Sequence, residues 1–189
     1  KEATVRKGYQ APEAPQRQEG RLSGVTVCID AGHQENGRFV NEPIGPGLTG
    51  STSGKGGMAQ GTKTNRRESI VCLEIGMLLR DELLRQGANV IMTREDQTTF
   101  HTNIERCEIA EAGGAQIMLR LHCNNSSNHS KRGIQVYGPL NSDYAKAVAD
   151  ADTYREMGQE LLDAMKTRVG MTLANSTGMV RLNDNYVGN

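Results

Sequence analysis

Two runs of apolar residues along the chain each end in a histidine. The first, VTVCIDAGH, spans residues 25–33, and the second, QIMLRLHCN, spans residues 116–124. Mostly apolar runs of this length are typical of strands buried on both faces of a parallel sheet, and ligands bind at the carboxyl ends of such strands. We therefore predict two strands that bring His33 and His122 to one edge of one sheet.

An amphipathic helix is predicted between these strands, over Asn65–Gln86, with Gly87 as its C-terminal stop. At about 100° per residue, an arc of about 60° holds Glu68, Cys72, Ile75 and Leu79, flanked by Val71 and Leu83. Glu68 would thus lie on the apolar stripe of the helix and not on its solvent face. A first-turn glutamate also complements the helix dipole, so this helix alone leaves a structural role equally open.

Two shorter elements complete a β-α-β-α-β series. A strand over Ala88–Thr93 and a helix over Asn103–Ala112 precede the strand that ends at His122. Right-handed crossovers in such a series commonly give the strand order 2-1-3. The strands of His33 and His122 would then be neighbours, with Glu68 just above the crevice between their carboxyl ends. The series predicts an α/β fold.

The rest of the chain predicts fewer elements. We expect a strand over Gly133–Tyr137, a linking segment over Leu140–Ala151, a helix over Asp152–Val169 closed by Gly170, and a strand over Gly178–Leu182. The apolar stripe of that helix would consist of Tyr154, Met157, Leu161 and Met165. A turn is predicted at Asn183–Asn185.

Two stretches predict loops. Residues 1–20 are rich in Pro, Gln and Glu and have almost no apolar periodicity, which favours a flexible linker. Residues 21–189 would then form a single domain with one core. The stretch Asn36–Thr64 is dense in Gly, Ser and Thr and exceeds the usual length of a connection, so we expect a rim or lid beside His33.

Charge and composition exclude several kinds of partner. The chain has 22 Lys and Arg against 22 Asp and Glu, so no strong net field favours nucleic acid or anionic lipid. Aromatic residues are 4% of the chain and there is no Trp, which argues against base stacking. No apolar run approaches the ~18 residues of a transmembrane segment. Because the chain begins at Lys1, a targeting or anchoring segment upstream is compatible with the sequence.

The cysteines predict no metal site of their own. Each lies in a separate predicted element, without a CxxC pair: Cys28, Cys72, Cys107 and Cys123. We interpret them as buried free thiols. Side chains alternate along a strand, so Cys123 should point away from His122, and we leave it out of the ligand set.

Two imidazoles and a carboxylate together predict a catalytic metal centre. Three protein ligands, His33, Glu68 and His122, would leave a fourth position for water, as in catalytic zinc sites. Asp30 fits either a further ligand or a hydrogen-bond acceptor that fixes an imidazole tautomer. The remaining histidines lie in predicted loops and are expected to be solvated: His101 and His129.

At this point the ordered motifs resemble a known family, the zinc-dependent N-acetylmuramoyl-L-alanine amidases of the bacterial cell wall and spore cortex. The resemblance runs from about residue 25 to the end of the chain and rests on Asp30-Ala31-Gly32-His33, Glu68, Leu73, Leu79, Gly87, Thr93-Arg94, Arg106 and Leu121-His122-Cys123-Asn124. It implies a mixed, mostly parallel twisted sheet with helices on both faces. It also implies that His33, Glu68 and His122 bind one zinc ion.

The resemblance implies hydrolysis of the amide between N-acetylmuramic acid and L-alanine in peptidoglycan. The expected partner is peptidoglycan or a muropeptide, and we expect a monomer that acts outside the cell or in the cell envelope and binds no nucleic acid. The family's catalytic glutamate, in a segment like P-x-x-L-x-E-x-G-F on a last strand, does not occur here. We therefore expect that strand and the general base beyond Asn189, and feeble activity at best for these residues alone.

Glu35 and Glu42 are not expected to replace that base, because both belong to the predicted loop and would not be held rigidly. Two other classes remain open. Another zinc peptidase, such as a carboxypeptidase, is disfavoured because Asn36 stands where an HxxE pair after His33 needs Glu. A non-catalytic or regulatory peptidoglycan-binding module would keep the zinc site without the base.

Overall fold

A computed structural model describes residues 11–35, 41–43, 51–53, 58–128, 130–138, 151–174 and 178–181 of the chain. The chain divides into two compact units. The first comprises Lys1–Glu42 and Ser53–Asn124, and the second comprises Pro43–Thr52 and Asn125–Asn189. The prediction of one domain over residues 21–189 is not tested by this division and stays a prediction.

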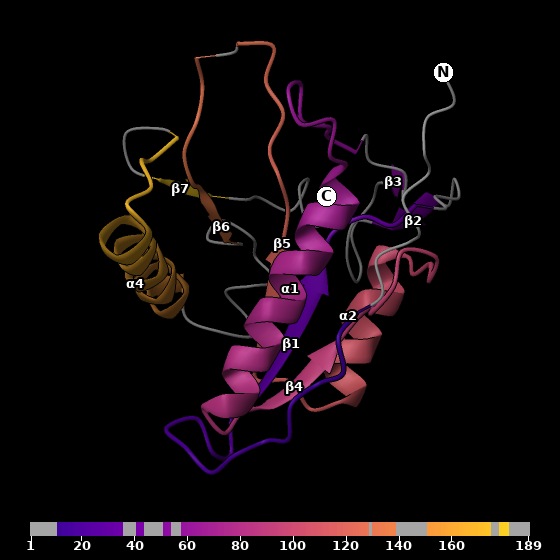
Figure 1. Ribbon diagram of the computed structural model, residues 1–189, viewed down its shortest axis with the longest axis vertical. Helices are drawn as coiled ribbons and strands as arrows, with labels where there is room; N and C mark the ends of the chain where they lie inside the picture. The colour runs from indigo at the N-terminus through magenta and orange to yellow at the C-terminus, as the bar shows by residue number, and fades with distance from the viewer. Residues whose placement is uncertain are drawn as a thin grey trace. The chain divides into compact units, whose positions relative to one another are not determined.

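A parallel sheet of three strands forms the centre of the first unit (Figure 1). Its order is β4 (Asn89–Met92), β1 (Thr26–Ala31) and β5 (Ile117–Leu121), all parallel. In this register Cys28 lies between Ile91 and Met118. The predicted α/β fold and the predicted order, with the first strand in the middle, are confirmed. Two short strands elsewhere, β2 (Asn41–Pro43) and β3 (Ser51–Ser53), form a separate sheet.

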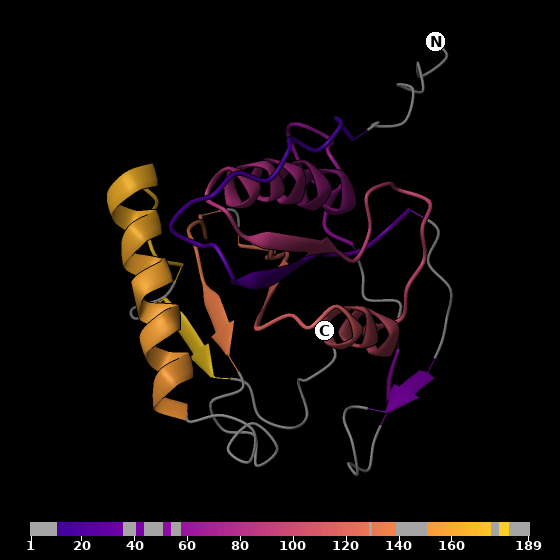
Figure 2. The same cartoon turned by 90° about the horizontal axis from the view of Figure 1, so that it is seen from below.

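Helices cover the two faces of this sheet, as Figure 2 shows: α1 (Glu68–Arg85) lies on one face and α2 (Asn103–Ala112) on the other. A Cβ placed on Gly76 of α1 would lie 3.4 Å from Ile29 Cγ2 and 3.6 Å from Ala31 Cβ. The intervening residue of β1, Asp30, contacts α2 instead, because strand side chains alternate between faces. The helix packs closely on β1, and a core cluster forms there from Ala31, Cys72, Leu73 and Met77.

Helix α1 begins three residues later than predicted. Asn65 has φ 55° and Arg67 is extended, with φ −76° and ψ 143°, so neither continues a helix. The predicted stop is confirmed, since Gly87 has φ 95°, a value that favours glycine.

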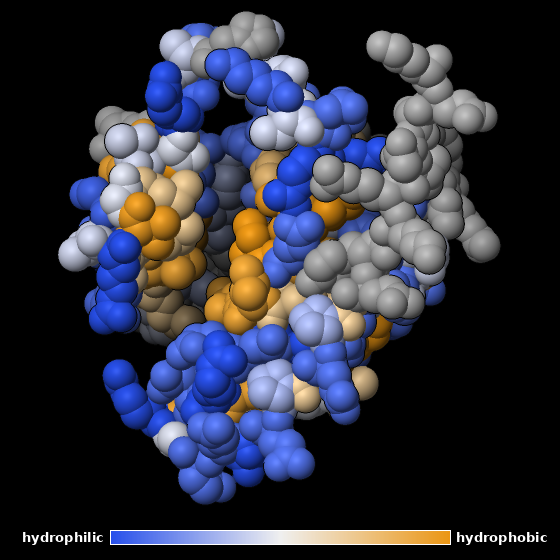
Figure 3. Space-filling model, in the orientation of Figure 1, coloured by the Kyte–Doolittle hydropathy of each residue, from blue (hydrophilic) through white to orange (hydrophobic). Residues whose placement is uncertain are grey.

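The buried face of α1 is also rotated from the predicted stripe. Glu68 and Cys72 are buried as expected, but Ile75 is 48% exposed, and Leu73 and Met77 occupy the core. Figure 3 shows hydrophobic surface over α1, where Ile75 and Leu78 are exposed.

Among the described residues, no helix is long and apolar enough to cross a membrane.

Helix α2 has the predicted bounds because its N-terminus is capped twice. Thr102 and Glu105 form a capping box. In addition, the Glu42 carboxylate accepts the backbone N–H groups of Asn103 at 3.0 Å and Ile104 at 2.8 Å. Glu42 belongs to β2 and is only 3% exposed. The prediction that Glu42 would be loosely held in a loop is therefore wrong, because it satisfies the first amide groups of α2.

Residues 11–20, within the predicted linker, contain no helix or strand but contact α1. The backbone N–H of Gln18 donates to the Leu84 carbonyl at 3.1 Å, and the Arg80 guanidinium donates to the Pro12 carbonyl at 2.9 Å. These residues thus lie along the helix that carries Glu68. Most of Asn36–Thr64 lies outside the described residues, so its role as a rim or lid stays a prediction.

The second unit contains a parallel strand pair and a long helix. Strand β6 (Val136–Gly138) pairs with β7 (Met179–Arg181), and α4 spans Ala151–Val169. All three overlap predicted elements, although β6 begins later than predicted. Gly170 closes α4 with φ 67°. The predicted link from Leu140 and the turn at Asn183–Asn185 lie outside the described residues.

The buried face of α4 differs from the predicted stripe. Leu162 is fully buried, whereas Met157 and Leu161 are 43% and 41% exposed. Leu162 packs beside Gly178, where a Cβ would lie 3.1 Å from the leucine methyl groups. The stripe was predicted from apolar residues alone. In the structure the buried position is Leu162, which packs against Gly178, the residue before β7.

Candidate metal centre

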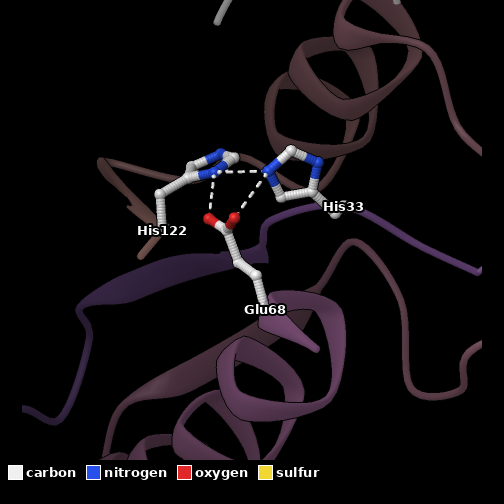
Figure 4. A group of neighbouring side chains, drawn as sticks. All are labelled: His33, Glu68 and His122. Atoms are coloured by element: carbon white, nitrogen blue, oxygen red, sulfur yellow. Dashed lines mark hydrogen bonds and ion pairs between the residues drawn. The ribbon is translucent and has the colours of Figure 1, made fainter. Parts of the chain in front are cut away.

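Three side chains from three elements converge at the carboxyl edge of the sheet (Figure 4). His33 follows β1, Glu68 is the first residue of α1, and His122 follows β5. His122 Nδ1 lies 3.2 Å from His33 Nε2 and 3.1 Å from Glu68 Oε1, and His33 Nε2 lies 3.3 Å from Glu68 Oε2. The structure thus brings together the three residues that the sequence singled out.

Backbone amides fix the Glu68 carboxylate. Its Oε1 accepts the N–H of Cys123 at 2.6 Å, and its Oε2 accepts the N–H of Ala59 at 2.8 Å. Burial alone would raise the pKa of Glu68, but its hydrogen bonds to His122, His33 and these two amides lower the pKa well below its usual range. The carboxylate is therefore ionised at neutral pH, and one side of each oxygen faces an imidazole.

Gly32 permits the close approach of the two strand ends. Its N–H donates to the Leu121 carbonyl at 2.9 Å. A Cβ on Gly32 would lie 2.4 Å from that carbonyl oxygen and 2.5 Å from His122 Cε1, closer than real contacts allow. The next residue, His33, has φ 57°, a left-handed conformation that is uncommon outside glycine and often marks functional sites. This turn directs the His33 ring back toward His122.

A buried guanidinium connects the end of β1 to the first turn of α1. Arg94, 2% exposed, donates to the carbonyls of Ala31 at 2.8 Å, Gly32 at 2.9 Å and Ser69 at 2.8 Å. Burial, and then the nearby charge of Arg106, lower the pKa of Arg94 to about 10, so it stays protonated at neutral pH. Arg94 thereby holds the segments of His33 and Glu68 in a fixed relation.

Asp30 has a different role from the two that the sequence left open. It is fully buried and accepts hydrogen bonds from the Thr93 hydroxyl at 2.6 Å, from Arg120 Nε at 2.6 Å, and from Arg106. Burial would raise the pKa of Asp30, but Arg120, Arg106 and the Thr93 hydroxyl outweigh it and lower the pKa. Asp30 pairs with arginines, and its bonds go to these residues and not to an imidazole.

The donor set fits a tetrahedral metal ion. Bonds of about 2.0–2.1 Å from zinc to nitrogen and oxygen place tetrahedral ligands about 3.3 Å apart. The two imidazole nitrogens lie 3.2 Å apart, and each lies 3.1–3.3 Å from one of the two oxygens of the Glu68 carboxylate, which agrees with that spacing. One carboxylate and two imidazole nitrogens facing one point are a typical set for a divalent metal. The cluster of His33, Glu68 and His122 could therefore hold a metal ion.

Other predicted residues lie away from this cluster. Glu35 is exposed and pairs with Arg67 at 2.7 Å, and Glu42 binds α2. His101 Nδ1 lies 3.9 Å from Oε2 of Glu105, which is part of the capping box of α2. His129 lies outside the described residues.

Sequence reasoning missed the groups that orient the ligands. Arg94 stood among the motif residues, but its bonds to main-chain carbonyls depend on tertiary contacts that the sequence does not show. Cys123 and Ala59 act through backbone amides, which leave no signal in the sequence.

The cysteines also differ from the prediction of buried thiols. All four are free: Cys28 and Cys72 are buried, Cys123 is half-buried and Cys107 is exposed. Cys123 does not point away from the site, because the strand ends at Leu121 and the alternation ends with it. Its sulfur lies with Glu68 and Cys72 in a second group whose ligand atoms are within 4.8 Å of one another.

Comparisons with known proteins identify a family and several structures with a similar fold. Residues 27–187 match the model of a family described as N-acetylmuramoyl-L-alanine amidase. Among solved structures, the amidase Ami1 from Mycobacterium abscessus is similar with a TM-score of 0.72 and 19% identity, over 86% of this chain and 76% of that chain.

Two further solved structures share the fold. The amidase from Clostridium difficile 630 gives a TM-score of 0.60 and 22% identity, over 84% of this chain and 70% of that one. The catalytic domain of CwlV from Bacillus (Paenibacillus) polymyxa var. colistinus gives 0.55 and 22%, over 86% and 72%. A comparison with curated proteins gives no match.

Proposed function

The chain belongs to the N-acetylmuramoyl-L-alanine amidase family, and from this premise we propose that it binds zinc through His33, Glu68 and His122 to hydrolyse the amide between N-acetylmuramic acid and L-alanine in peptidoglycan. The observation that carries the proposal is the geometry at the carboxyl edge of the sheet, where the imidazole nitrogens of His33 and His122 lie 3.2 Å apart and each lies 3.1–3.3 Å from an oxygen of Glu68.

The residues of this chain supply a preorganised, anionic metal cradle. When bound, zinc would polarise the amide carbonyl and lower the pKa of its water. Glu68 contributes the negative charge and is kept from turning by the amides of Cys123 and Ala59. His33 and His122 contribute imidazole nitrogens, and Arg94 holds the backbone segments of His33 and Glu68. The position of the general base stays a prediction.

The substrate and its place follow from the family. Peptidoglycan or a muropeptide is the substrate class, and we propose that the protein acts at the cell envelope or outside the cell, as a monomer without a nucleic-acid partner. A non-catalytic peptidoglycan-binding module and another zinc peptidase remain the alternatives, and the products of digestion distinguish all three.

Digestion of soluble muropeptides, followed by mass spectrometry, tests the proposal. The zinc-loaded protein should release stem peptides whose L-alanine carries a free amino group, and His33→Ala should release none. Cleavage within the stem peptide would instead indicate a peptidase. Binding of muropeptides without cleavage by the zinc-loaded protein would indicate a binding module.

A further inference from the structure

Two cysteines lie side by side directly beneath the metal centre. Cys72 follows Glu68 by one turn of α1 and is 1% exposed, and Cys123 follows His122 and is half-buried. Their sulfur atoms lie within 4.8 Å of each other, and both thiols are free. The proposed function uses neither thiol, so the pair needs its own explanation.

We propose that Cys72 and Cys123 form a disulfide by exchange with a low-molecular-weight disulfide, which crosslinks α1 to the residue that follows His122. This inference does not rest on the proposed function, because it concerns the state of two thiols. It assigns the pair as a covalent modification site beside the metal ligands.

The backbone already holds the two cysteines in place. The Cys123 N–H donates to Glu68 Oε1 at 2.6 Å, and Glu68 precedes Cys72 by one helical turn. Cys72 belongs to the core cluster with Ala31, Leu73 and Met77, and Cys123 packs against that cluster. A disulfide needs a sulfur–sulfur distance of about 2.05 Å. Because the two sulfur atoms already lie within 4.8 Å of each other, forming this bond requires them to approach by less than about 3 Å.

The difference in exposure between the two thiols determines which of them reacts first with the external disulfide. The half-buried Cys123, as the thiolate, attacks one sulfur of the external disulfide RSSR, and RS⁻ leaves. Cys72 then attacks the Cys123 sulfur of the mixed disulfide, and its proton passes to the departing sulfur, which leaves as the second RSH. Overall, two protein thiols are oxidised to one disulfide, and RSSR is reduced to two RSH.

The other cysteines cannot replace either member of the pair. Cys28 lies two residues before Asp30 in β1, so both side chains are on the same face of the sheet, and that of Asp30 contacts α2. Cys107 belongs to α2. Both therefore lie across the sheet from α1, where Cys72 is buried. Cys107 is exposed and lies on the opposite face of the sheet from Cys72, so it is a matched internal control.

The test is peptide mapping of the folded, full chain after incubation with oxidised glutathione and alkylation of the remaining thiols. We expect a linked peptide that contains Cys72 and Cys123, with a mass lower by two hydrogens than the sum of the reduced peptides. Cys107→Ser should leave this link unchanged. Cys72→Ser should instead trap one glutathione on Cys123, and Cys123→Ser should leave Cys72 as a thiol.

A second readout needs no variant. The oxidised wild-type protein should melt at a higher temperature than the reduced protein, and dithiothreitol should reverse the shift. Three results would overturn the inference: absence of the linked peptide from folded protein, its formation only after denaturation, or glutathione persisting on Cys123 in the wild type as it does in Cys72→Ser.

Discussion

At the scale of single residues, the metal ligands make the sharpest prediction. His33→Ala and His122→Ala should each lose most zinc affinity, because two remaining ligands hold zinc poorly. Zinc content after dialysis, measured by atomic emission, checks this. His101→Ala is the matched control, since His101 lies beside the α2 capping box, and it should keep full zinc content. Unchanged zinc in both ligand variants would exclude the site.

Asp30 predicts a large loss of stability and a specific pH dependence. Asp30→Asn leaves Arg106, 4% exposed, without its charge partner, and breaking such a buried pair typically costs about 3–5 kcal/mol. Urea denaturation measures this loss. Glu19→Gln removes an exposed pair with Arg17 and should cost about 0–1 kcal/mol.

The pH dependence follows from the sign of the Asp30 shift. A lowered pKa means that the folded state binds fewer protons at this group than the unfolded state. Its contribution is therefore present above the ordinary pKa of 3.8 and is lost as the pH falls through the lowered value. Wild-type stability should fall in that acid range more steeply than that of Asp30→Asn. Parallel acid profiles would contradict the assignment.

At the scale of elements, two glycines that contact the sheet predict opposite outcomes. A Cβ on Gly76 meets neighbours at ordinary distances of 3.4–3.6 Å, so Gly76→Ala should stabilise α1 by about 0.5–1 kcal/mol. Gly32→Ala would collide with the Leu121 carbonyl and the His122 ring, and should weaken zinc binding by about 10–100-fold, as other perturbed ligand supports do. Thermal unfolding and zinc titration of both variants measure the two effects.

The N-terminus of α2 makes a further prediction at this scale. Glu42→Ala removes the acceptor for the Asn103 and Ile104 amides, and loss of a helix cap costs about 0.5–2 kcal/mol. Urea denaturation should show this loss while zinc content stays unchanged, because Glu42 contacts the N-terminus of α2 and is not a member of the metal cluster. An equal loss of zinc would mean that β2 supports the site directly.

The elements also show how far the sequence leads. The strand order and the meeting of His33, Glu68 and His122 follow from apolar periodicity and crossover rules, because the apolar runs and the order of the elements can be read along the chain. The start of α1 does not, since the backbone at Asn65 and Arg67 decides it. The partners of Asp30 and Glu42 lie far away in the chain, and their bonds to arginines and helix amides depend on tertiary packing.

At the scale of the whole molecule, zinc should raise the melting temperature. A ligand that binds only the folded state stabilises it by about 2.7 kcal/mol at 100 times its dissociation constant. The ligands come from the ends of β1, α1 and β5, so the gain should appear in global unfolding. Calorimetry with and without a chelator measures it, and His122→Ala should abolish the shift. A shift that survives in that variant would indicate zinc bound elsewhere.

Arg94 gives the centre an uneven tolerance to mutation. Its guanidinium reaches only main-chain oxygens, those of Ala31, Gly32, Asp96 and Ser69. A carbonyl is supplied by any amino acid, so the identity of a partner such as Ser69 is free to drift during evolution without loss of its bond. Selection should instead act on Arg94 itself, because lysine lacks the planar array of N–H groups that these four acceptors require. As far as this contact is concerned, natural variation should therefore be wider at Ser69 and Asp96 than at Arg94.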